Sequence, residues 1–435
     1  MLKNKKLFLI AVMACVISSL GAQTNSPYSR YGYGVLRDQV TGPSKGMGGI
    51  GYGLRNSLSA NPINPASYSR VDSLTFLFDM GVSGSRAKLS DESASRNDYN
   101  GGLDYITTLM PLSKRVGFSL GILPYSTIGY DFGSKEKAGT VEYTKAYSGS
   151  GGLSQVYAGL GYLTPIDGLS VGVNASFLFG TLDQTRSVPS IGATSNLSTE
   201  YSELTIKTFK FDIGVQYEMA VSKDNNLVLG AVFTPGINST GNYQNIHHEV
   251  NSSTGYPITS DTLSVNGVDA GLPTTLGAGF TLTHKQKLIV GADITYQDWS
   301  SVKYSSLMGD GLDKSNRFND RWKYAAGIEY TIDPMSRNFF HRMKLRGGGN
   351  YSNSYLNVKD TNGNVNGYNE YGATIGFGLP LRDRESFGNR TSYLNINFEY
   401  KKIDPKAGNL VKEEYFGISV NVNINELWFY KKKIQ

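Results

Sequence analysis

Few residues of this chain form a pattern that could do chemistry. Gly117-Phe118-Ser119-Leu120-Gly121 matches the G-x-S-x-G pattern of a hydrolase nucleophile. That pattern needs a sharp turn between a strand and a helix. Residues 115–128 instead read as one continuous strand, so we predict no catalytic role for Ser119.

Two further patterns suggest cation binding. His247 and His248 stand beside Glu249 in a polar segment, which could hold a metal but is more typical of a solvated loop. A series of alternating acceptors imitates the start of a calcium loop, but Val365 and Tyr371 stand at the required sixth and twelfth positions. That series is Asp360, Asn362, Asn364 and Asn366. We therefore expect no metal, no cofactor and no enzymatic activity.

The composition narrows the class of protein. Of 435 residues, 18% are charged, 12% are aromatic and 51 are glycine, which fits neither a coiled coil nor a disordered polyelectrolyte. Cys15 is the only cysteine, so disulfides and cysteine-ligated zinc are excluded. The net charge of +6 is small and scattered, so no nucleic-acid partner is expected.

The first residues predict export. Three lysines precede an apolar run from Leu7 to Leu20, which ends in Gly21-Ala22-Gln23. This arrangement is typical of a secretory signal peptide, here residues 1–22. A lipoprotein anchored at Cys15 is the alternative, although the apolar run continues beyond that cysteine.

Period-two alternation dominates the rest of the chain. Ile418, Val420, Val422 and Ile424, for example, alternate with polar residues. Because successive strand side chains point to opposite faces, such segments have one apolar and one polar face. We predict fourteen strands at 73–90, 101–111, 115–128, 153–164, 168–186, 202–221, 225–240, 273–284, 287–300, 320–332, 341–354, 367–381, 390–403 and 413–430.

The predicted connections alternate between six short turns and seven longer segments. The long ones are 91–100, 129–152, 187–201, 241–272, 301–319, 355–366 and 404–412, which are rich in Gly, Ser, Asn, Asp and Thr. A transmembrane β-barrel sorts its connections in this way, with aromatic residues near both interfaces. We therefore predict an all-β, 14-stranded antiparallel barrel over residues 73–430, with a basic periplasmic tail at 431–435. A soluble secreted all-β protein is the alternative.

Residues 23–72 do not alternate and are rich in glycine and proline. They include Gly46, Gly48 and Gly49, followed by Asn64-Pro65-Ala66. Such a segment favours compact, turn-rich structure. Because a lumen of fourteen strands is wide, we predict that this segment enters at the periplasmic mouth and forms a plug.

The glycine stretch, the Asn-Pro-Ala motif and the strand count together resemble the FadL/TodX family of outer-membrane channels. The resemblance implies a hatch carried by Gly46, Gly48, Gly49, Asn64, Pro65 and Ala66. It also implies lateral release at an inward kink of the third strand, where Pro124 lies. Proline lacks the amide that a strand ladder needs, although Pro124 could also simply end the pairing. The chain's opening and ending are similar to those of Bacteroidetes outer-membrane proteins.

The resemblance implies passive uptake of a hydrophobic, fatty acid-like molecule across the bacterial outer membrane. Both termini would be periplasmic, and the partners would be outer-membrane lipid and that small molecule. The alternative is a non-transporting barrel subunit of a secretion or barrel-assembly complex, with other outer-membrane proteins as partners.

Overall fold

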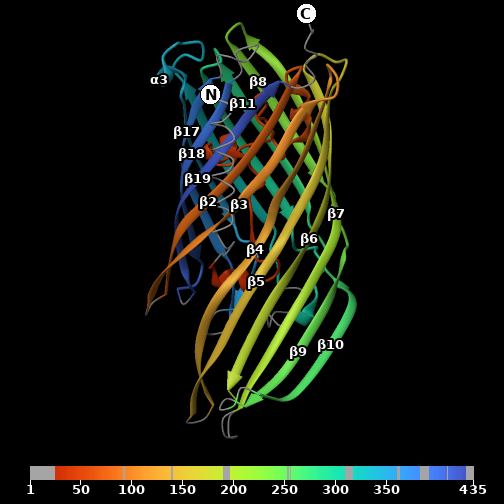
Figure 1. The fold of residues 1–435 in the computed structure, drawn as a ribbon, viewed down its shortest axis with the longest axis vertical. Coiled ribbons are helices and arrows are strands. Elements are labelled where there is room, and N and C mark those ends of the chain that lie inside the picture. Colours follow the sequence, from red (N-terminus) through yellow and green to blue (C-terminus); the bar gives the residue numbers. More distant parts are fainter. Residues whose placement is uncertain are drawn as a thin grey trace, which may run out of the picture.

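Fourteen strands close into an antiparallel barrel, as the alternation predicts (Figure 1). The computed structural model describes residues 25–91, 94–138, 141–189, 196–251, 254, 256–308, 317–359, 363–382, 391–408 and 410–427. The wall runs through β2 (Thr75–Ser90), β3 (Ser95–Pro111), β4 (Val116–Ala138), β5 (Val141–Leu163), β6 (Leu169–Pro189), β7 (Asn196–Ser222), β8 (Asn225–Thr234), β11 (Thr274–His284), β12 (Leu288–Asp298), β13 (Arg321–Thr331), β14 (Lys344–Asn353), β17 (Tyr368–Arg382), β18 (Thr391–Pro405) and β19 (Lys412–Leu427). Pairing of β19 with β2 closes the ring.

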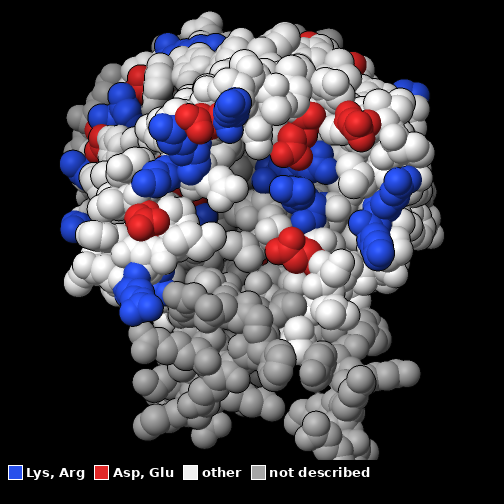
Figure 2. Space-filling model, turned by 90° about the horizontal axis from the view of Figure 1, so that it is seen from above, with Lys and Arg blue, Asp and Glu red and all other residues white. Residues whose placement is uncertain are grey.

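The barrel has a short-turn end and a long-loop end. The first residues of β2 pair with the last described residues of β19 at the short-turn end, which lies uppermost in Figure 1. The short helix α3 (Phe339–Arg342) belongs to one of these turns. Where Figure 2 shows the described residues of this end, Lys and Arg are interspersed with Asp and Glu. The predicted signal peptide and C-terminal tail lie outside the described residues.

Several predicted loops are instead extensions of the strands. β4 and β5 continue far beyond the predicted bounds, and residues 240–269 form a hairpin of β9 (Thr240–Asn251) and β10 (Pro257–Asp269). Pro235 follows the end of β8 and separates it from this hairpin. The apolar period is missing from these extensions because neither face of the sheet there has to meet lipid, so alternation could not reveal them.

The outer face of the wall carries an apolar band. On β13, Trp322, Tyr324, Ile328 and Tyr330 are exposed, whereas the intervening Glu329 points inward and is buried. Cross-strand partners on the neighbouring strand β14 face the same way, since Tyr330 pairs with the outward-facing Leu345. No helix among the described residues is long and apolar enough to cross a membrane.

An arginine on this outer face should be costly in lipid. Phe398 lies within the band on β18 and is 46% exposed. Phe398→Arg should cost about 2–4 kcal/mol of unfolding free energy in vesicles, with Phe398→Leu as the conservative control. Urea titration of the folded band on gels measures this cost. Equal stability of the two variants would contradict the assignment of this face to lipid.

The N-terminal segment lies inside the barrel and forms the plug, residues 25–72. It contains η1 (Pro27–Arg30), β1 (Val35–Leu36), α2 (Gly42–Gly46) and η2 (Pro65–Arg70). The described chain begins in the long-loop half of the lumen, because the Ser26 hydroxyl donates to Glu413 at the start of β19 (2.8 Å). This differs from the predicted entry at the periplasmic mouth. Smaller elements in the long-loop connections are η3 (Ser306–Met308), β15 (Val358–Lys359) and β16 (Val365–Asn366).

Candidate functional site: the plugged lumen

The wall approaches the plug so closely that only glycine fits at many inward positions. A Cβ on Gly230 would overlap the Tyr52 backbone, and one on Gly117 would overlap the Tyr68 backbone. Further inward glycines whose Cβ would meet the plug are Gly161, Gly172, Gly214, Gly327, Gly348 and Gly376. Direct contact between the two backbones leaves no passage along these faces.

The Asn-Pro-Ala motif ties the plug to β7. Asn64 is fully buried, and its amide Nδ2 donates to the carbonyl oxygens of Tyr52 (2.8 Å) and Val215 (3.2 Å). Its Oδ1 accepts from the Ala66 amide and so caps η2, which begins at Pro65. The motif therefore joins two parts of the plug to the wall.

Loss of the Asn64 amide should loosen this junction. Asn64→Ala should lower the unfolding free energy by about 2–3 kcal/mol, because it removes two buried hydrogen bonds, to the Tyr52 and Val215 carbonyls, and a helix cap. Asn64→Ser keeps a capping oxygen without burying a charge and should cost less. Limited proteolysis within residues 25–72 gives the readout, and identical protection of both variants would contradict this role.

The glycine stretch binds the opposite wall. Gly48 and Gly49 follow α2 with φ of 68° and 88°, a conformation that favours glycine. The Gly48 amide donates to Thr374 Oγ1 (2.9 Å), and Asn350 Nδ2 donates to the Gly48 carbonyl (3.0 Å). Thr374 also donates to the Gly46 carbonyl (3.1 Å).

Asp293 and Glu329 point from the wall into the lumen and are buried there. Asp293 Oδ2 accepts the Gly51 and Tyr52 amides (2.5 and 3.0 Å) and so holds the plug from β12. Glu329 is bound by Lys344 and Arg346 on β14 (2.7 and 2.6 Å). Both carboxylates therefore have structural partners.

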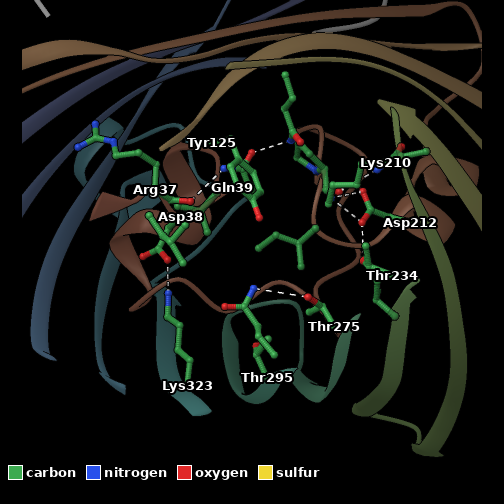
Figure 3. Close-up of a pocket in the computed structure, with 18 of the residues that line it drawn as sticks. Arg37, Asp38, Gln39, Tyr125, Lys210, Asp212, Thr234, Thr275, Thr295 and Lys323 are labelled. Atoms are coloured by element: carbon green, nitrogen blue, oxygen red, sulfur yellow. Dashed lines mark hydrogen bonds and ion pairs between the residues drawn. The ribbon is translucent and has the colours of Figure 1, made fainter. Parts of the chain in front are cut away.

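A cavity between plug and wall is small and has both charged and apolar residues in its lining. Its volume is about 160 Å³, and Figure 3 shows charged and hydroxyl side chains around it. Lys210 Nζ binds Asp212 Oδ1 (2.6 Å), while Lys323 binds Asp38. Desolvation in the enclosed lumen would raise the pKa of the Asp38 carboxyl, but Lys323 and other nearby cations hold it well below its usual range.

An aromatic cluster closes the long-loop half of the lumen. Tyr33 of the plug and Trp299 are fully buried, with ring centroids 5.7 Å apart. The hydroxyls of Tyr33 and Tyr304 donate across this contact, to the carbonyls of Gly271 (2.6 Å) and Gly32 (2.9 Å). Gly271 and Tyr304, which lie in two of the long connections, thus contact the plug. No local sequence pattern predicts these contacts, because they join residues far apart in the chain.

The wall is interrupted at one seam, which we call the β3–β4 window. β3 and β4 pair only from Ile106–Ile122 to Pro111–Gly117, and they separate toward the long-loop end (Figure 1). Pro124 follows the Ile106–Ile122 pair toward the long-loop end, at a bulge between Pro124 and Ser126. A cavity of about 460 Å³ lies here. Its use for lateral release stays a prediction.

The residues singled out for chemistry lie in structural positions. Ser119 points into the wall–plug contact, where its hydroxyl donates to the Thr108 carbonyl and lies 2.8 Å from the Tyr157 hydroxyl. His247 and His248 lie on β9 opposite Asp261 and Ser260. Among the described residues, no group of three or more His, Cys, Asp or Glu could hold a metal.

Comparison with known proteins identifies the family. The family model for BamG matches residues 1–435. The chain belongs to the BamG family. No curated protein matches it.

Solved structures show the fold of this BamG-family chain. The CymD monoaromatic hydrocarbon channel has a TM-score of 0.58 at 14% identity, covering 89% of this chain and 98% of that one. The P. putida toluene transporter TodX has a TM-score of 0.60 at 15% identity, covering 92% of this chain and 99% of that one. A Pseudomonas aeruginosa FadL homologue has a TM-score of 0.57 at 12% identity, covering 91% of this chain and 100% of that one. The FadL-like barrel predicted from the plug motif and strand count is thus confirmed.

Proposed function

We propose that this chain is an outer-membrane barrel whose lumen stays closed, and that it serves as a non-transporting subunit of a secretion or barrel-assembly complex. Its short-turn end would face the periplasm, and the apolar band would face outer-membrane lipid. The plugged lumen carries this proposal. A cavity of about 160 Å³ is below the roughly 300–1,000 Å³ of typical ligand pockets, and ion pairs such as Lys210–Asp212 stand in its lining beside the apolar side chains.

The aromatic residues of the long loops support the same proposal. In a channel for hydrophobic molecules these side chains would be free to bind the ligand. Here Trp299, Tyr304 and Phe318 pack around Tyr33 of the plug itself. Capture of an apolar molecule would first have to displace this buried contact.

Passive uptake of a hydrophobic, fatty acid-like molecule is the second candidate. The β3–β4 window and its larger cavity favour it, as does the fold shared with hydrocarbon channels. Movement of the hatch around Asn64 and release past Pro124 would complete such a path. Against this, small polar residues and glycines make up most of the lining of the window.

Purification from native membranes in mild detergent separates the two functions. Mass spectrometry should find outer-membrane proteins in reproducible stoichiometry and no stoichiometric apolar ligand. Planar-bilayer recordings should show no steady conductance from the wild-type barrel. A bound fatty acid or similar molecule that is lost in Asn64→Ala, without protein partners, would instead establish uptake.

A further inference from the structure

The two strand edges of the β3–β4 window differ in how far the plug pairs with their backbone. On the β4 side, Val35 and Leu36 of the plug pair with Thr127 and Ser126. The Arg37 amide donates to the Tyr125 carbonyl (2.9 Å), and the Ser26 amide donates to the Gly129 carbonyl (2.8 Å). The plug therefore covers much of the β4 edge.

The β3 side has no such cover. Residues Ser95–Leu103 pair with β2 on one edge, and no backbone partner meets their other edge within the described chain. Within Ser95–Leu103 the plug contributes the hydrogen bond from the Asn25 amide to the Asn100 side chain (3.0 Å), while Arg37 and Lys45 bind Asp104, the residue after this stretch (3.2 and 2.8 Å). Near the far end, the exposed Arg96 side chain reaches the Asp131 carbonyl (3.5 Å). This edge of Ser95–Leu103 is about 30 Å long, and no described backbone pairs with it.

An open edge in this position is unfavourable. The window begins beside outward-facing Leu103 and Ile122, within the apolar band, where unsatisfied backbone groups are costly. Proteins usually shield such an edge with proline, a bulge, charge or a covering segment. Here Asp104 and Pro124 supply bulges at the start of the window, but from Leu103 to Ser95 no backbone of the described residues covers the edge.

The lining of the window suits recognition of a backbone. Glycines occur on both sides, at Gly101 and Gly102 of β3 and at Gly151 and Gly152 of β5. Most of the remaining lining residues are small and polar, such as Ser83, Ser85 and Thr181. Such a surface offers hydrogen-bonding groups and few side-chain pockets, which is the chemistry of strand addition.

We propose that an extended segment of a partner protein adds to β3 at Ser95–Leu103 and completes the wall at the window. This rests on the proposed function as a complex subunit, and it names where the partner is held. Next to Leu103 the segment presents apolar side chains to lipid and small polar ones to the lumen. Its backbone bonds the free edge of β3, as β1 bonds the edge of β4.

Site-specific photocrosslinking in native membranes tests the location. Tyr99 is 75% exposed on β3, and Phe416 on β19 is 59% exposed on the same register line, since both pair with Arg86. Benzoylphenylalanine at Tyr99 should give at least tenfold more protein adduct than the same probe at Phe416, whose strand is paired on both edges. The crosslinked peptide should map to one segment of one partner.

Neighbouring prolines test whether backbone pairing holds that segment. Along a strand, successive amides point to opposite edges, so one of Asn97→Pro and Asp98→Pro removes an amide from the β2 pairing and the other removes one from the open edge. The variant that keeps the wild-type unfolding temperature is the open-edge one. It should lose the Tyr99 adduct at least tenfold, and amides of Ser95–Leu103 should exchange at least tenfold more slowly in the complex than in the isolated barrel.

Three results would overturn the inference. They are equal adducts at Tyr99 and Phe416, an adduct with lipid or with a second copy of this chain, and an adduct unaffected by the open-edge proline. If partners co-purify but crosslink elsewhere, the proposed function stands and this docking site fails. If no partner co-purifies at all, both fail.

Discussion

Gly348→Ala is expected to destabilise the barrel by about 2–3 kcal/mol and to open its lumen, whereas Gly347→Ala should change stability by less than about 0.5 kcal/mol. The two glycines are neighbours on β14. A Cβ on Gly348 would overlap the backbone of Met47 and Gly48, while one on Gly347 would lie 3.8 Å from its nearest neighbour, Ile328 Cγ2. Backbone cannot move aside as a flexible side chain can.

The same pair of variants reports on closure. Displacement of Met47 and Gly48 breaks the Gly48 bonds to Thr374 and Asn350, so the plug should leave that part of the wall. Planar-bilayer conductance should rise in Gly348→Ala alone, and urea titration gives the change in stability. If both variants behave like the wild type, the plug does not rest on β14, and the argument for a closed lumen loses its main support.

The strand pattern was predictable because lipid and lumen impose opposite requirements on alternate residues. Phe398 and Asn397 show this clearly, as one faces outward and the other is fully buried against the plug. The requirement ends where the sheet leaves the membrane, so the extensions of β4 and β5 were missed. The break near Pro124 could be predicted because proline removes a ladder amide, a local property.

The closure of the lumen could not be predicted in the same way. The contacts of Tyr33 with Trp299 and Tyr304 join residues more than 200 positions apart, and nothing in their local sequences marks them. The difference in backbone pairing between the β3 and β4 edges of the window is also a tertiary property, since it depends on where Val35 and Leu36 lie. Sequence therefore predicted a plug and its motif, but not whether the plug leaves room for a ligand.

Arg346→Met is expected to cost about 3 kcal/mol, the second large effect. The Arg346 side chain is 2% exposed and Glu329 is 5% exposed, with Nε and Oε2 2.6 Å apart. Arg346 Nη1 also donates to Asn395 Oδ1 (2.7 Å). Removal of the guanidinium leaves Glu329 with Lys344 alone and Asn395 Oδ1 without this donor, and breaking a buried pair typically costs several kcal/mol.

Arg321→Met is the matched control, because Arg321 also faces the lumen but lies by the small cavity and binds Glu370 at 3.4 Å. It should cost about 1 kcal/mol. The double variant Glu329→Gln with Arg346→Met should cost less than the sum of its single changes, since the first removes the charge that the second leaves unpaired. Thermal unfolding in vesicles measures all four.

The position of Arg346 connects this network to the plug. A Cβ on Gly46 would lie 3.2 Å from Arg346 Cδ, so the arginine stem supports the turn that carries Gly46 and Gly48. Arg346→Met should therefore also expose the plug to protease, while Arg321→Met should not. Loss of stability without added protease access would mean that the network supports the wall alone, and that the plug is held chiefly by Asn64, Asp293 and the aromatic cluster around Tyr33.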